Sequence, residues 1–162
     1  MNFISSSAII SNLSDIETSI RGSSLNICED VLIDSFVKIK FVGGLGNIYI
    51  GRGTKINSGC VLYSGNGIQI GENVLIASNT TLAPVNHKYI EKLTIISQQG
   101  FKKSKGGIII EEDVWIGAGV VLLDGTVIKK GSVIGAGCIG QLKTEEYGVY
   151  VGNPLKLIKW RI

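Results

Sequence analysis

The segment between Ile110 and Ile139 repeats every six residues. An aliphatic residue opens each of five consecutive units, at Ile110, Ile116, Leu122, Ile128 and Ile134. A small or β-branched residue follows four places later in every unit, at Val114, Val120, Thr126, Ser132 and Cys138. Neither an α-helix nor a simple alternating strand has this period. A six-residue repeat is typical of a parallel β-helix.

The same period extends through most of the chain. Units also begin at Ile27, Ile33, Ile39, Ile50, Ile56, Ile70 and Ile76, with slips of phase that fall on Gly- and Asn-rich segments. Such slips belong at corners, where Gly and Asn accept a positive φ. We interpret each unit as a short strand and a turn, with three units forming a triangular coil. Coils would stack about 4.8 Å apart, with the aliphatic residues pointing inward. This interpretation predicts an all-β parallel β-helix.

The two ends of the chain are less regular. Residues 1–26 are expected to form an imperfect coil that caps the repeat, because terminal repeats have one face in water. A C-terminal tail, residues 150–162, leaves the repeat at Gly152-Asn153-Pro154. Its apolar residues Leu155, Leu157, Ile158 and Trp160 are expected to pack against the last coil, with the basic residues facing out.

Residues 83–109 interrupt the repeat, which then restarts in full at Ile110. A long loop inside a compact domain is uncommon and is usually functional or disordered. This loop contains His87, the only histidine of the chain. We therefore expect an excursion from one corner of the β-helix, with a role in function.

Composition excludes several other classes. The 162 residues suit one domain, and no apolar run is long enough to span a bilayer. The first residues lack a basic segment followed by a long apolar one, so the expected location is the cytoplasm. The net charge is +3 without dense basic clusters, which argues against nucleic acid as a partner. Cys60 and Cys138 occupy small-residue positions of the repeat and are expected to be packed thiols, not metal ligands.

Four further motifs lie along the repeat in a fixed order. They are Asn86-His87-Lys88-Tyr89, Val114-Trp115-Ile116-Gly117-Ala118-Gly119, Ile134-Gly135-Ala136-Gly137 and Val151-Gly152-Asn153-Pro154. With the repeat, this set resembles the hexapeptide-repeat acetyltransferases over residues 27–161. The resemblance is greatest to the branch that contains galactoside and maltose O-acetyltransferases and the O-antigen or capsule sugar acetyltransferases.

The resemblance implies a left-handed β-helix, a homotrimer, and active sites between neighbouring subunits. It also implies acetyl-CoA as donor and a histidine as general base. A surface-glycan carbohydrate would be the acceptor.

Acetyl transfer needs a base for the proton of the acceptor and donors for the oxyanion. A histidine, with a pKa near 6.5, suits the first task at neutral pH, so His87 is the candidate base. Backbone N–H groups at a Gly-rich corner suit the second task. The partner that fixes the ring of His87 is left open between a backbone carbonyl and a carboxylate such as Glu111 or Glu112.

The remaining candidates divide between the two substrates. Acceptor contacts are expected from Asn79, Asn57, Tyr63, Asn86 and Trp115, with Trp115 as a wall of the site or a subunit contact. Small residues stacked one coil apart would leave a groove for the pantetheine arm, at Gly117, Ala118, Gly135 and Ala136. Lys143 and Lys156 are the candidates for the CoA phosphates, together with Lys159 and Arg161.

Three alternatives stay open. The same base and groove would serve N-acetylation of an amino sugar nucleotide or of a drug. The γ-type carbonic anhydrases share this architecture, but their site takes three histidines, two from one chain, and this chain has one. The third alternative is a structural scaffold or an inactive paralogue.

Overall fold

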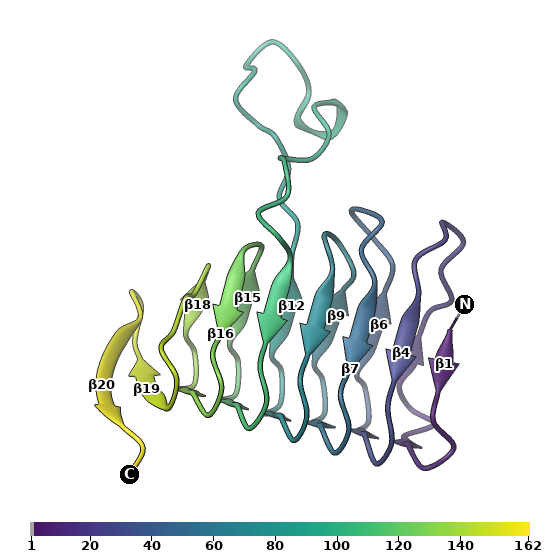
Figure 1. Ribbon diagram of the computed structural model, residues 1–162. Helices are drawn as coiled ribbons and strands as arrows, with labels where there is room; N and C mark the ends of the chain where they lie inside the picture. Colours follow the sequence, from purple (N-terminus) through teal and green to yellow (C-terminus); the bar gives the residue numbers. More distant parts are fainter. Residues whose placement is uncertain (1) are drawn as a thin grey trace.

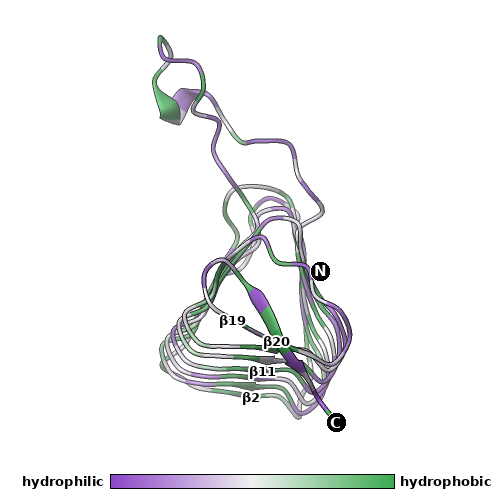
Figure 2. Ribbon diagram, turned by 90° about the vertical axis from the view of Figure 1, so that its left-hand side faces the viewer, coloured by the Kyte–Doolittle hydropathy of each residue, from purple (hydrophilic) through white to green (hydrophobic). Residues whose placement is uncertain are grey.

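The computed structural model describes residues 2–162. Its strands form the three faces of a triangular prism, in which successive coils of the chain lie side by side (Figures 1 and 2). All pairings between coils are parallel, and only the last strand pairs antiparallel. The predicted left-handed parallel β-helix is confirmed.

We call the faces sheets A, B and C, in the order in which the chain visits them. Sheet A contains β1 (Phe3–Ile4), β4 (Leu25–Ile27), β7 (Ile48–Ile50), β10 (Ile68–Ile70), β13 (Ile108–Ile110) and β16 (Thr126–Ile128). Sheet B contains β2 (Ile9–Ile10), β5 (Leu32–Ile33), β8 (Lys55–Ile56), β11 (Leu75–Ile76), β14 (Trp115–Ile116), β17 (Val133–Ile134), β19 (Gly148–Val151) and β20 (Lys156–Trp160). Sheet C contains β3 (Asp15–Ile16), β6 (Lys38–Lys40), β9 (Val61–Tyr63), β12 (Thr81–Ala83), β15 (Val121–Leu123) and β18 (Ile139–Gly140).

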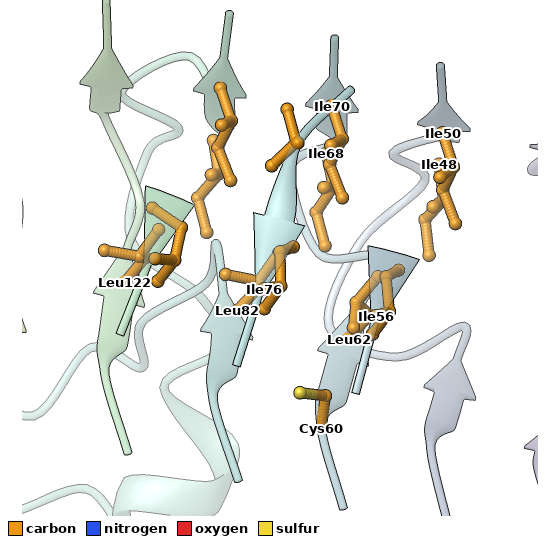
Figure 3. Close-up of a cluster of buried hydrophobic side chains, with 14 of the residues drawn as sticks. Ile48, Ile50, Ile56, Cys60, Leu62, Ile68, Ile70, Ile76, Leu82 and Leu122 are labelled. Atoms are coloured by element: carbon orange, nitrogen blue, oxygen red, sulfur yellow. The ribbon is translucent and has the colours of Figure 1, made fainter. Parts of the chain in front are cut away.

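The aliphatic residue of each repeat unit points into the prism and stacks on its counterpart in the next coil. On sheet A, Ile70 is in register with Ile50 on one side and with Ile110 on the other. Figure 3 shows these columns of buried Ile and Leu side chains. Each such side chain contributes about 1.5–3 kcal/mol when it is fully buried. The six-residue period therefore sets the register of all three faces.

The small or β-branched position of the repeat unit lies near the corners and is also buried. Val114, Val120, Thr126, Ser132 and Cys138 are at most 1% exposed, as predicted. The hydroxyl of Thr80 shows how a polar residue fits there, because it donates to the carbonyl of Gly117 at 3.1 Å. Cys60 and Cys138 are fully buried, in agreement with packed thiols, and burial raises the pKa of the Cys60 thiol.

The first coil is complete although its sequence is irregular. Its strands β1, β2 and β3 pair with β4, β5 and β6 of the next coil. Ile10 and Ile16 pack against the core, whereas Ile20 is 96% exposed.

The C-terminal tail differs from the prediction. Only Leu155 packs against the core, and Leu157, Ile158 and Trp160 are 42%, 55% and 49% exposed. The reason is that β20 turns back and pairs antiparallel with β19 as the last strand of sheet B, and no further coil covers its side chains.

The interrupting loop runs from Pro84 to Gly107 and projects far from the prism (Figure 1). It is slightly shorter than predicted, because Ala83 ends β12 and Ile108 and Ile109 begin β13. Within the loop is one short 3-10 helix, η1 (Ile96–Gln98). Among residues 2–162, no helix is long and apolar enough to cross a membrane.

Replacing a residue of the inward column tests this account of the core. Ile76→Ala is expected to lower the free energy of unfolding by about 2–5 kcal/mol, because it leaves a cavity between two coils. Leu93→Ala is the control, since Leu93 is 94% exposed in the loop, and should change it by less than about 0.5 kcal/mol. Urea unfolding at one protein concentration measures both. Equal losses would contradict the assigned core.

Candidate active site

The loop that contains His87 leaves the prism at the corner between sheets C and A. Its two legs pair in an antiparallel arrangement, with His87 opposite Phe101. The N–H of Lys88 donates to the carbonyl of Gly100 at 2.9 Å, and the N–H of Lys102 donates to the carbonyl of Asn86 at 2.7 Å. The ring of Phe101 lies 4.6 Å from that of His87, centroid to centroid. The legs therefore form a short stem that supports His87 outside the prism.

The His87 ring is exposed, and no hydrogen bond joins it to another of residues 2–162. Glu111 and Glu112 do not face it, because they lie at the corner between sheets A and B. Glu111 accepts from Nζ of Lys129 at 2.7 Å and from the N–H of Lys130 at 2.9 Å. Glu112 forms an ion pair of 3.0 Å with Lys130. Neither carboxylate is placed to fix the ring within one chain.

A second group of candidates, which we call the corner column, lies at the corner between sheets B and C. Asn57, Asn79, Ala118 and Ala136 are exposed there in successive coils. Only Ala118 and Ala136 occupy equivalent positions, each two residues after an inward Ile. Backbone hydrogen bonds join the coils at this corner. The N–H of Gly119 donates to the carbonyl of Ser78, and the N–H of Gly137 donates to the carbonyl of Ala118. Asn79 has a φ of 61°, a left-handed conformation that Asn and Gly adopt most readily. Corner geometry alone thus accounts for an Asn at position 79.

The small residues of this corner are of two kinds: glycines that packing requires, and alanines that leave the backbone exposed. A Cβ atom on Gly117 would lie 2.5 Å from the nitrogen of Ala136, so glycine is needed there for the coils to stack. A Cβ on Gly135 would lie 2.8 Å from Cγ1 of Val151. Ala118 and Ala136 instead face solvent, and their backbone N–H groups donate to no other residue within 2–162. The exposed backbone of these two alanines is what the corner offers to a ligand.

The other predicted acceptor contacts are spread over two faces. Tyr63 ends β9 on the outer side of sheet C, one coil from Ala83, and so lies near the start of the loop. Asn86 is on the stem beside His87. Trp115 is 53% exposed on sheet B, in register with Leu75 and Val133. Within one chain Trp115 and His87 are therefore on different sides of the prism.

The candidate phosphate contacts lie near the C-terminal end. Lys143 follows β18 and pairs with Val127 on the side of sheet A. It lines a hollow of about 360 Å³ together with Asn153 and Pro154 of the Gly-Asn-Pro motif. Lys156 is exposed at the start of β20 and does not line that hollow. Arg161 is already engaged, because it pairs with Asp113 at 2.9 Å.

Two features near the loop were not predicted. Phe101 is the aromatic partner of His87, and only the pairing of the two legs reveals it. A hollow of about 420 Å³ lies on the outer side of sheet A beside the returning leg, lined among others by Tyr49, Gln69, Gly106 and Ile109. In residues 2–162, no three His, Cys, Asp or Glu side chains are grouped so as to hold a metal ion.

The candidates thus form two separate halves. The loop with His87, Asn86 and the nearby Tyr63 belongs to the edge of sheet C that meets sheet A. The column with Asn79, Ala118 and Ala136 belongs to the opposite edge of sheet C. One chain does not bring the two halves together.

Comparison with known proteins shows what the chain is similar to. The model of the bacterial transferase hexapeptide family, "six repeats", matches residues 107–139. The galactoside O-acetyltransferase of Lactococcus lactis is 33% identical over 121 residues, which are 74% of this chain and 56% of that protein. The mitochondrial gamma carbonic anhydrase 2 of Arabidopsis thaliana is 31% identical over 71% of this chain and 44% of its own length. The chain therefore spans about half the length of these relatives.

A solved structure covers more of the chain. It is a variant of AntD, an N-acyltransferase from Bacillus cereus, in complex with dTDP-4-amino-4,6-dideoxyglucose and coenzyme A. The TM-score is 0.82 at 25% sequence identity, over 98% of this chain and 83% of that one.

The ion pair at the corner between sheets A and B predicts a dependence of stability on pH. The hydrogen bond from Lys129 holds the pKa of Glu111 below its ordinary value. A depressed carboxyl pKa stabilises the fold above about pH 4.3, and this contribution is lost as the pH falls through the lowered value. Glu111→Gln should therefore cost roughly 1 kcal/mol at pH 7 and progressively less below about pH 4. Urea unfolding at pH 7, 5 and 3 measures this, and a difference that does not depend on pH would contradict it.

Proposed function

We propose that the chain is an acetyl-CoA-dependent acetyltransferase of the hexapeptide-repeat transferases, to which its repeat and its relatives relate it. The proposed acceptor is a carbohydrate hydroxyl, in the synthesis of a surface polysaccharide such as O-antigen or capsule. The observation that supports this most is the His87 loop. The only histidine of the chain is held on a paired stem outside the prism. Free backbone N–H groups are exposed at another corner, between sheets B and C.

The corner column fits the pantetheine arm of CoA. That arm contains two amide carbonyls, which accept hydrogen bonds. The N–H groups of Ala118 and Ala136 are exposed one coil apart, about 4.8 Å, and have no partner within residues 2–162. Larger side chains at these two positions would cover the backbone. Lys143, beside the Gly-Asn-Pro hollow, is the proposed contact for a phosphate of CoA, and Lys156 is a second one.

His87 would act as the general base. Acetyl-CoA supplies an activated acetyl group as a thioester. One ring nitrogen of neutral His87 accepts the proton of the acceptor hydroxyl as its oxygen attacks, and the protonated ring can return that proton to the departing thiolate. Phe101 restricts the ring from one side. Asn86, Tyr63, Asn57, Asn79 and Trp115 are the proposed contacts for the acceptor.

The two halves of the site imply an assembly. Because they lie on opposite edges of sheet C, a complete site needs the loop of one copy and the corner column of another. A closed ring of three copies with sheet C toward the axis brings these edges together three times. This is the proposed homotrimer, and it makes the ring of His87 accessible to groups of the next subunit.

The outer side of sheet C suits this arrangement. Its outward residues over the last four coils are mainly apolar and partly exposed, namely Val61, Tyr63, Thr81, Ala83, Val121, Leu123 and Ile139. Charged residues on this sheet are confined to the first coils, where Lys40 pairs with Asp15 at 2.6 Å. An apolar, partly exposed face of this kind is typical of the core of a subunit contact.

N-acylation of a nucleotide-linked amino sugar is the second candidate. It is favoured by the likeness to AntD, whose structure holds such a sugar nucleotide and coenzyme A. A panel of galactosides, maltose, dTDP-4-amino-4,6-dideoxyglucose and chloramphenicol, with thiol release from acetyl-CoA as readout, separates the candidates. A folded trimer that does not bind CoA in calorimetry would instead indicate a scaffold. Stoichiometric zinc would revive the carbonic anhydrase alternative.

Removing the base tests the catalytic assignment. His87→Ala is expected to lower kcat by a factor on the order of 10² to 10⁴, the range for loss of a general base. Lys92→Ala, an exposed position farther along the same loop, is the matched control and should keep full activity. Steady-state rates with the best acceptor of the panel measure both. Turnover near that of the wild type in His87→Ala would refute the role of this residue.

Charging the apolar face tests the assembly. Val121→Arg places a cation in the middle of the proposed interface and should convert the trimer to monomers, with loss of activity. Gln69→Arg makes the same kind of change on sheet A, where Gln69 is exposed, and should leave the trimer intact. Light scattering after size-exclusion chromatography measures the mass of each. A trimeric Val121→Arg protein would show that another face mediates assembly.

A further inference from the structure

We propose that Asp124, together with Asn66, is the residue that positions the His87 loop for catalysis. The inference rests on the proposed function of His87. The hydrogen bonds that hold the loop are observed independently of that function. Asp124 does not touch the His87 ring. It would act through the backbone of the two legs.

Asp124 is a buried carboxylate that holds the returning leg. It is 4% exposed and lies directly after β15, in the coil that follows the loop. Oδ2 accepts from the N–H of Lys105 and Oδ1 from the N–H of Gly107, both at 2.8 Å. A buried charge is costly unless it is fully hydrogen-bonded, and charge-assisted bonds to backbone N–H groups are among the stronger ones. The last residues of the loop are thereby fixed to the prism.

Asn66 connects this carboxylate to the outgoing leg. Its side-chain Nδ2 donates to Oδ2 of Asp124 at 3.1 Å, and its backbone N–H donates to the carbonyl of Pro84 at 3.0 Å. Asn66 belongs to the coil before β10, so the pair joins the coils on either side of the loop. Both legs are thus tied to this pair of residues, which we call the clamp: the returning leg to the buried side chain of Asp124, and the outgoing leg to the backbone of the half-buried Asn66.

The acid of the clamp stands beside the loop. In the four coils from β6 to β15, the first residue after the strand of sheet C is Phe41, Ser64, Pro84 and Asp124. Among these four the only acid is the one that accepts two N–H groups of the returning leg. In the first coil, Glu17 follows β3 and accepts one N–H, that of Phe41 at 3.0 Å. Asparagine could not replace Asp124, because its side-chain NH₂ group would face a backbone N–H of the returning leg, and both groups are donors.

The distance along the chain from the clamp to the base is short. His87 is three residues after Pro84, and its partner Phe101 is four residues before Lys105. Between these points the legs are paired by backbone hydrogen bonds. A change in the angle between the paired legs and the prism therefore moves the imidazole of His87. A misplacement of that ring by about 1 Å can lower the rate on the order of 10²-fold.

The isosteric variant Asp124→Asn tests the clamp in the intact protein. Trypsin should cut the loop at the exposed Lys102, Lys103 or Lys105 at least about tenfold faster, because one leg is released. The kcat with the best acceptor should fall on the order of tenfold, with KM for acetyl-CoA within about twofold of the wild type. Asn66→Ser, which removes only the side-chain bridge, should show the same pattern more weakly.

Two controls distinguish positioning from a general loss of stability. Glu111→Gln alters a carboxylate that also accepts a backbone N–H, but at the corner away from the loop, and should change neither kcat nor loop cleavage. In the His87→Ala background, Asp124→Asn should lower the remaining rate by less than about twofold, because its effect acts through His87.

The outcomes separate the clamp from the proposed function. Loop cleavage at the wild-type rate in Asp124→Asn, or an equal fall of kcat in Glu111→Gln, overturns the proposal. An effect of full size in the His87→Ala background does so as well. If the wild type transfers no acetyl group to any acceptor of the panel, the proposed function fails, and the trypsin measurement still decides whether the clamp holds the loop.

Discussion

Stacking of aliphatic side chains at the spacing of a parallel sheet is the constraint on which the rest of this structure depends. On the faces of the prism, the backbone N–H and C=O groups are used by the ladders between coils. An insertion within a face would leave such groups unpaired, at a cost comparable to lost hydrogen bonds. The chain can therefore leave the prism only at a corner, and the loop from Pro84 to Gly107 does so. The location of the candidate base follows from this restriction.

The period of the sequence predicts the inward residues well, because register in a β-helix is repeated from coil to coil. Ile110 and Val114 are buried as expected. The prediction for Leu157, Ile158 and Trp160 is wrong, since outside the repeat the pattern does not tell which strand the tail will pair with. The loop was predicted from the break in the period. The clamp was not, because Asn66 and Asp124 are 58 residues apart and neither departs from ordinary corner composition.

The candidate site divides its work between side chain and backbone. His87 is a side chain on a stem, and its position depends on hydrogen bonds some residues away. Ala118 and Ala136 offer backbone groups whose position is set by the coils themselves. The second half of the site is thus as rigid as the prism, whereas the first half is only as rigid as the attachment of the loop. Substitutions at the base of the loop and in the core should for this reason affect function differently.

The reversed direction of β20 limits how long such a structure can become. A parallel β-helix presents at its end a row of unpaired backbone groups, which would accept a further coil from another molecule. On sheet B this row is occupied by a strand of opposite direction. The edge of β19 is therefore not open to a coil of another molecule, and the parallel ladder of sheet B ends inside the chain.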